Sequence, residues 1–225
     1  DLKKRYLDGF YHHPDWYCTF SPYRFLPKYI RPLVPSGILS NMTKLKIIKL
    51  TDCNLTSLQE DVFSGSYSVK SLYLNRNYFR RLEENTFFDL EDLEVLDLSE
   101  NYINHLPEKI FYKTKRLKIL KMQYNLLVQM KQRLFLHLNE LEYLDLRFNK
   151  IKEIKEEQFI GLKSLRFLNI SDNQLSSLAL TTRLGDSGNY SVLQNCTNLE
   201  DLQLANNSLT EVYVDWKILL NRLHT

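Results

Sequence analysis

A repeat of 24 residues organises most of this chain and limits what it can fold into. Each copy begins with an apolar-x-x-apolar-x-apolar pattern, and an asparagine or a cysteine follows three residues later. Because a fixed period of this size is typical of solenoids, we expect stacked coils that share one continuous core. The copies start at Leu45, Val69, Leu93, Leu117, Leu141 and Leu165, and a seventh starts at Leu199 after 34 residues.

The apolar pattern predicts a short strand in every copy, since side chains alternate between the two sides of a strand. In the third copy, Leu96 and Leu98 should point into the core, while Val95, Asp97 and Ser99 point outwards. The residue after the strand has a structural role, because a carboxamide can satisfy backbone groups of the turn and of the next coil. This asparagine/cysteine ladder consists of Cys53, Asn77, Asn101, Asn125, Asn149, Asn173 and Asn207.

A phenylalanine recurs 18 residues after the start of five copies. An aromatic stripe at fixed spacing favours a core position, so we expect a second buried row beneath the convex side. The charged residues that precede these rings suit solvated turns. The row consists of Phe63, Phe87, Phe111, Phe135 and Phe159.

The repeat resembles the leucine-rich repeat family, whose signature is L-x-x-L-x-L-x-x-N/C-x-L, over residues 39–212. The resemblance implies an α/β solenoid: a horseshoe with a parallel concave β-sheet and an irregular or 3-10 convex side. Residues 1–38 form an irregular aromatic flank with a degenerate coil that we expect to begin near residue 21. Residues 179–198 are an insert that should loop out and leave the sheet unbroken, as a tolerated insertion or as a partner contact. Residues 213–225 look like the start of a further coil that is cut short.

The residue types argue for a binding surface and against an enzyme. The chain has 30 basic and 27 acidic residues spread along its length, without the basic stripe of a nucleic-acid binder. Neither a catalytic motif nor a metal-binding pattern occurs, and the three cysteines Cys18, Cys53 and Cys196 are too few for a disulfide framework. We therefore predict no catalytic residue, no cofactor, no metal, no nucleic-acid partner and no membrane contact by this segment.

The concave face is where a solenoid presents its extended surface. Tyrosine and arginine are enriched at interface hot spots, and large aromatic side chains add contact area at a small entropic cost. The outward positions that carry such residues are our candidates for protein binding: Tyr73, Arg76, Tyr124, Tyr143, Arg147 and Phe148.

Six Asn-x-Ser/Thr sequons indicate passage through the secretory pathway and predict glycosylation sites. Among them, Asn169 lies at an outward strand position, where a glycan would keep a protein partner away from the local concave surface. The six candidates are Asn41, Asn54, Asn169, Asn189, Asn195 and Asn206.

The C-terminal segment narrows the resemblance. The insert, followed by Val212, Tyr213, Asp215, Trp216 and Lys217, is similar to the ectodomain of insect Toll receptors. This similarity implies an extracellular part of a cell-surface receptor that binds Spätzle, a dimeric cystine-knot cytokine, and that can form a receptor dimer. Two alternatives stay open: a soluble leucine-rich repeat scaffold of the immune or matrix type, and an adhesion module whose concave face binds another leucine-rich repeat or cell-surface chain.

Overall fold

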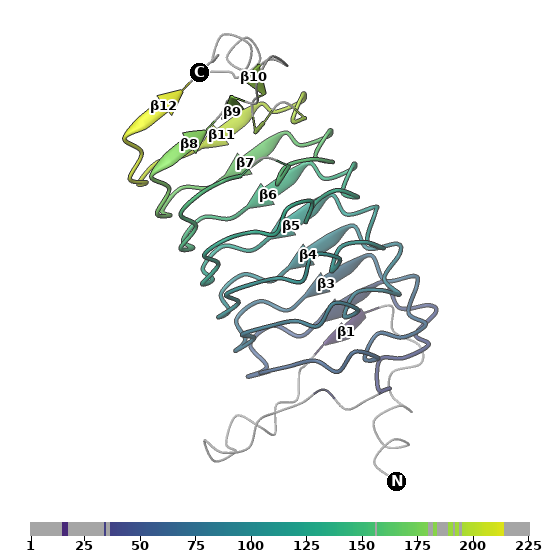
Figure 1. Ribbon diagram of the computed structural model, residues 1–225. Helices are drawn as coiled ribbons and strands as arrows, with labels where there is room; N and C mark the ends of the chain where they lie inside the picture. Colours follow the sequence, from purple (N-terminus) through teal and green to yellow (C-terminus); the bar gives the residue numbers. More distant parts are fainter. Residues whose placement is uncertain are drawn as a thin grey trace.

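The computed structural model describes residues 15–17, 34, 37–155, 157–179, 182–183, 189–190, 192–193 and 195–213. Most of the N-terminal flank with Cys18, much of the insert, and Asp215, Trp216 and Lys217 lie outside these residues. In the described part, the chain winds as stacked coils, each of which contributes one strand to a parallel sheet, and turns form the opposite side (Figure 1). This arrangement confirms the predicted solenoid.

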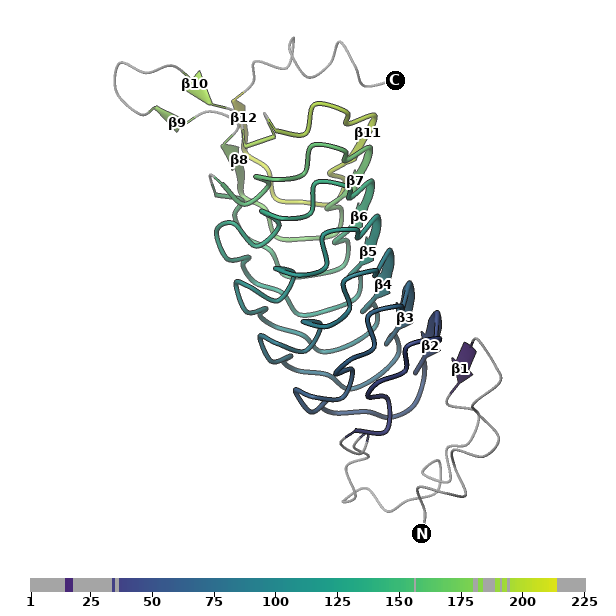
Figure 2. The same ribbon diagram turned by 90° about the vertical axis from the view of Figure 1, so that its right-hand side faces the viewer.

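The main sheet has eight strands in the order β1-β2-β3-β4-β5-β6-β7-β11 among the described residues. Figure 2 shows these strands along one side of the stack and the turns along the other. No helix occurs within the described ranges, so the convex side there is built from turns. The strands are β1 (Asp15–Tyr17), β2 (Ile47–Lys49), β3 (Ser71–Tyr73), β4 (Val95–Asp97), β5 (Ile119–Lys121), β6 (Tyr143–Asp145), β7 (Phe167–Asn169) and β11 (Asp201–Gln203).

The first strand departs from the 24-residue register. Asp15 pairs with Ile47, a separation of 32 residues, and residue 21, near which a degenerate coil was predicted to begin, lies outside the described residues. The connection from β1 to β2 is therefore longer than one 24-residue repeat.

The insert leaves the main sheet unbroken, as predicted, because β11 pairs directly with β7 and Asp201 lies opposite Phe167. Two further strand pairs lie on the side of the turns (Figure 2). Within the insert, β9 (Thr182–Arg183) pairs antiparallel with β10 (Asn189–Tyr190). On either side of it, β8 (Ser177–Ala179) pairs in parallel with β12 (Glu211–Tyr213).

The core is one continuous row of apolar side chains from coil to coil. The central leucines of β3 to β7 are fully buried, because each coil covers the apolar side of its neighbour. The predicted phenylalanine row is confirmed: all five rings are buried, and Phe135 stacks between Phe111 and Phe159 with centroids 6.2 and 6.3 Å away. Near the insert, burial raises the pKa of the Cys196 thiol to about 12.

The asparagine ladder ties each coil to the one before it. Asn101 Nδ2 donates to Leu74 O of the preceding coil at 3.0 Å, and Asn101 Oδ1 accepts the Phe79 N–H at 3.1 Å. The same contacts recur at Asn125, Asn149 and Asn173. The predicted backbone role is confirmed, but the predicted direction was wrong, since the carboxamide reaches the preceding coil and not the next.

Candidate protein interface

The register of the strands arranges the outward side chains in four rows that run across the coils. Two rows come from the first and last residues of each strand, and two come from the residues that follow it. The first row is Ile47, Ser71, Val95, Ile119, Tyr143, Phe167 and Asp201; the second is Lys49, Tyr73, Asp97, Lys121, Asp145, Asn169 and Gln203. The third is Thr51, Asn75, Ser99, Gln123, Arg147, Ser171 and Ala205; the fourth is Asp52, Arg76, Glu100, Tyr124, Phe148, Asp172 and Asn206.

The fourth row has a left-handed backbone conformation at every coil, with φ between 52° and 57°. Residues with a Cβ rarely adopt this conformation, because Cβ then crowds the backbone. The contacts between coils hold it: Tyr124 N donates to Arg147 O at 3.1 Å and Phe148 N donates to Ser171 O at 3.2 Å. At Tyr124 and Phe148 this row presents two exposed aromatic side chains.

Tyr124 and Phe148 stack on each other, with ring centroids 4.5 Å apart and planes 7° from parallel. Although paired, the rings remain 47% and 41% exposed. Offset or parallel stacking at this distance is favourable, and the exposed faces and edges remain available to a partner. Both residues were predicted from the sequence, and the structure brings them together.

A second aromatic pair lies on the coil of Phe148 and on the coil that follows it. Tyr143 stacks on Phe167 with centroids 4.4 Å apart and planes 2° from parallel. Both rings are half-buried in the first row. Phe167 was not among the predicted candidates, although it occupies the same outward position of its repeat as Tyr143. Its register opposite Tyr143 was the signal that could have identified it.

Polar groups lie between the two aromatic pairs. Arg147 Nε is 3.2 Å from Asp145 Oδ2, which is an ion-pair distance, although the N–H is not aligned for a hydrogen bond. Asp145 is 1% exposed, and burial raises the pKa of its carboxyl despite the nearby Arg147 backbone N–H and guanidinium. Burial likewise raises the pKa of the Tyr143 phenol. The Arg147 side chain stays 41% exposed, so a charged donor stands between two aromatic surfaces.

The other two predicted residues lie apart from this cluster. Tyr73 lies under Lys49, whose Nζ is 5.7 Å from the ring centroid, and Arg76 pairs with Glu100 at 3.2 Å. The coil of β4 separates both from Tyr124. We therefore define the aromatic cluster as Tyr124, Tyr143, Arg147, Phe148 and Phe167.

Some outward polar residues are less accessible than their position implies. Asp97 and Ser99 are 8% and 3% exposed, and Ser99 Oγ donates to Asp97 Oδ1 at 2.6 Å. The prediction that they face outwards agrees with the register, but coil-to-coil packing covers them. Asn169 repeats this arrangement with Ser171, and it is 2% exposed.

Four other predicted glycosylation candidates have described side chains. Asn41 and Asn206 are exposed, whereas Asn54 and Asn195 are half-buried. Asn41, Asn54 and Asn206 have φ values of 58°, 55° and 53°. For Asn189 the structure describes only the backbone, in β10.

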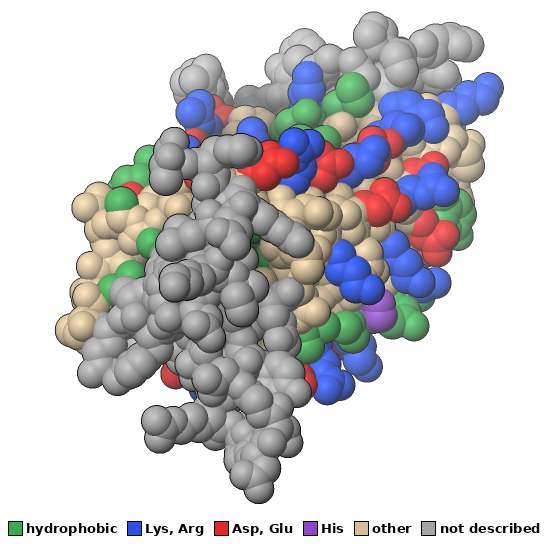
Figure 3. All heavy atoms as spheres, turned by 90° about the horizontal axis from the view of Figure 1, so that it is seen from above, with side chains coloured by type: hydrophobic (Ala, Val, Ile, Leu, Met, Phe, Trp, Pro, Cys, Tyr) green, Lys and Arg blue, Asp and Glu red, His purple; other side chains and the backbone are tan. Residues whose placement is uncertain are grey.

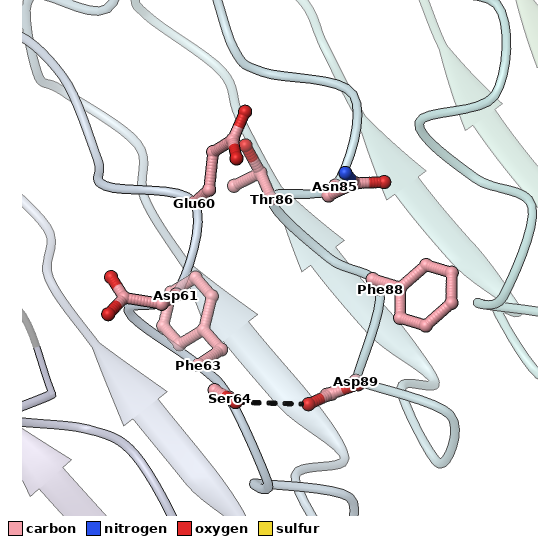
Figure 4. Close-up of a pocket in the computed structure, with 8 residues that line it drawn as sticks. All are labelled: Glu60, Asp61, Phe63, Ser64, Asn85, Thr86, Phe88 and Asp89. Carbon is pink, nitrogen blue, oxygen red and sulfur yellow. Dashed lines mark hydrogen bonds between the residues drawn. The ribbon is translucent and has the colours of Figure 1, made fainter.

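The convex side has a shallow cavity of about 360 Å³ between two neighbouring turns in the described coils. Figure 4 shows Phe88 and Asp61 pointing away from the space between the turns, while Ser64 and Asp89 are joined by a 3.4 Å hydrogen bond. The cavity therefore has no convergent set of polar groups. Its lining comprises Glu60, Asp61, Phe63, Ser64, Asn85, Thr86, Phe88 and Asp89.

Charges are mixed on the surface. Figure 3 shows basic and acidic side chains interspersed on the described coils. Ion pairs join successive coils, such as Lys70 with Glu94 at 2.6 Å and Arg166 with Glu200 at 2.8 Å. The described residues contain no group of three or more His, Cys, Asp or Glu placed to hold a metal ion. The same residues contain no helix with the length and apolarity needed to span a membrane.

The stacked coils, the parallel sheet and the asparagine ladder define a leucine-rich repeat solenoid whose outward face presents exposed aromatic and charged side chains. The leucine rich repeat family matches residues 43–103, 68–127, 93–149 and 115–175, which together are more than half of the 225 residues. The chain therefore belongs to the leucine-rich repeat family. None of the curated proteins compared with this chain matches it.

Solved structures place the fold among receptor ectodomains and other repeat proteins. Drosophila Toll, in its glycosylated complex with Spätzle, is 29% identical with a TM-score of 0.73 over 82% of this chain. TLR13 in complex with ssRNA13 is 28% identical with a TM-score of 0.67 over 76%. A Leptospira interrogans leucine-rich repeat protein is 26% identical with a TM-score of 0.67 over 81%. The chain spans 25%, 23% and 42% of these three chains.

Proposed function

We propose that this chain is part of the extracellular ligand-recognition region of a Toll-type receptor and that its concave face binds a Spätzle-like cystine-knot cytokine. The observation that carries the proposal is the aromatic cluster, in which two stacked ring pairs on adjacent coils flank the charged Arg147. Interface hot spots combine such aromatic area with a directed arginine donor.

The likeness to the Toll chain in its Spätzle complex supports a protein ligand. The six sequons support an extracellular, glycosylated chain of a cell-surface protein. The mixed charges of the outward rows favour a protein over RNA, because nucleic-acid binding depends on concentrated positive charge. The ssRNA seen with TLR13 is nevertheless the appropriate second ligand to test.

A binding measurement with the double variant Tyr124→Ala, Arg147→Glu tests the proposal. We expect the Kd for an immobilised Spätzle-like dimer to rise at least tenfold, which corresponds to about 1.4 kcal/mol. The matched control is Tyr67→Ala, Arg81→Glu, which alters an exposed tyrosine and an arginine in loops away from the strands. Equal binding by both variants would place the ligand site outside the aromatic cluster.

The alternative function is a soluble leucine-rich repeat immune or adhesion scaffold that binds another protein, including another leucine-rich repeat chain. It predicts no measurable binding of the cytokine dimer by the unmodified chain. Capture of a second leucine-rich repeat chain, lost in the Tyr124→Ala, Arg147→Glu variant, would favour it.

A further inference from the structure

The sequon at Asn169 differs from the others because its asparagine is the last residue of a strand in the main sheet. Asn169 Nδ2 donates to Gln203 Oε1 on β11 at 2.7 Å. Asn169 Oδ1 accepts hydrogen bonds from the Ser171 N–H at 2.9 Å and from Ser171 Oγ at 2.6 Å. The side chain is 2% exposed. The nitrogen that would carry a glycan is therefore the atom that joins two coils.

We propose that the Asn169 sequon carries no glycan in the folded protein and that its carboxamide serves as a bridge between β7 and β11. Asn169 lies opposite Gln203 in the parallel register, and neighbouring strands are only about 4.8 Å apart. Because Asn169 is only 2% exposed, a sugar on Nδ2 could reach solvent only if the neighbouring outward side chains moved apart. Attachment at Asn169 and closure of the coil that contains β11 are thus mutually exclusive.

The sequons at Asn41 and Asn206 have the opposite geometry. Both side chains are exposed, and both residues have a left-handed backbone. Asn206 Nδ2 donates to Asp172 Oδ1 at 2.8 Å, but this contact is exposed and water can replace it. We expect glycans at Asn41 and Asn206. The first three outward rows, from β4 to β11, then carry no glycan, and these rows include the Tyr143 and Phe167 pair.

Two engineered sequons test whether burial or the acceptor sequence itself determines glycosylation. Asp97→Asn creates an Asn-Leu-Ser sequon at the equivalent position of β4, where Ser99 Oγ already contacts the side chain of Asp97 at 2.6 Å. Glu84→Asn creates an Asn-Asn-Thr sequon on an exposed turn. Ser171→Thr keeps both the Asn169 sequon and the hydroxyl that bonds to it, and threonine sequons are the better acceptors.

The test is mass spectrometry of glycosylation at each sequon after expression in secretory cells, on the secreted and the cell-retained fractions. In the secreted fraction we expect glycan at Asn41, at Asn206 and at the substituted position of Glu84→Asn. We expect none at Asn169, including in Ser171→Thr, and none at the substituted position of Asp97→Asn. Chains modified at these buried positions should appear only in the retained fraction. A glycan at Asn169 in secreted, protease-resistant protein would overturn the proposal, whatever the chain binds.

Discussion

The substitution Asn101→Leu tests the asparagine ladder, because the contacts of this one buried carboxamide are well defined. Asn101 Oδ1 accepts the Phe79 N–H at 3.1 Å. Its Nδ2 donates to three carbonyl oxygens at 3.0 to 3.1 Å: those of Leu74, Leu98 and Ser99. Leucine has a similar size and can make none of these bonds.

The free-energy cost of Asn101→Leu depends on which backbone groups lose their last hydrogen-bond partner. Each of the three carbonyls keeps a second donor, namely Asn77 Nδ2 on Leu74, Asn125 Nδ2 on Leu98 and the Arg76 N–H on Ser99. Among the described contacts, the Phe79 N–H has Asn101 as its acceptor and no other. An orphaned buried donor costs about 1–3 kcal/mol, and we expect Asn101→Leu to destabilise the fold by about that amount.

Urea unfolding followed by circular dichroism measures this loss, provided that the slope of the transition is unchanged. Asn77→Leu should cost more than Asn101→Leu, because Asn77 Oδ1 accepts two backbone N–H groups, those of Cys53 and Leu55. The control is Asn139→Leu at an exposed position. If Asn101→Leu is no more destabilising than Asn139→Leu, the reasoning about the ladder is refuted.

Two further predictions concern the core and pH. Phe135→Ala should destabilise the fold by about 3–5 kcal/mol in the same assay, because it opens a cavity between the Phe111 and Phe159 rings; a loss below that of Asn101→Leu would count against the buried row. Burial raises the pKa of the Asp145 carboxyl, so the folded state binds its proton more tightly than the unfolded state does. The contribution of Asp145 to the free energy of unfolding therefore falls as pH rises from about 4 through the raised pKa. The stability of Asp145→Asn relative to the unmodified chain should therefore increase across that window, and a pH-independent difference would contradict the stated cause.

The repeat made the coils predictable, because one apolar pattern determines the strand, the inward leucines and the ladder at every copy. The first strand was not predictable in this way, since residues 15–17 carry no repeat signature and their pairing depends on a long connection. Burial of outward polar groups was also missed. Asn169 looks accessible when strand alternation alone is considered, but its bond to Gln203 arises only when a 34-residue coil brings β11 next to β7.

The backbone at Tyr124 and Phe148 offers a way to separate binding from folding. Both residues have a left-handed conformation, which costs a residue with a Cβ about 1–2 kcal/mol and which asparagine tolerates better. Asparagine already occupies the same row at Asn206, with φ 53°. The double variant Tyr124→Asn, Phe148→Asn should lose the stacking energy of about 0.5–1.5 kcal/mol but recover a similar amount of backbone strain. We therefore expect a urea midpoint close to that of the unmodified chain, together with at least tenfold weaker cytokine binding. If the free energy of unfolding falls by as much as the free energy of cytokine binding, the two rings serve folding. The left-handed row then gives no evidence of a binding site.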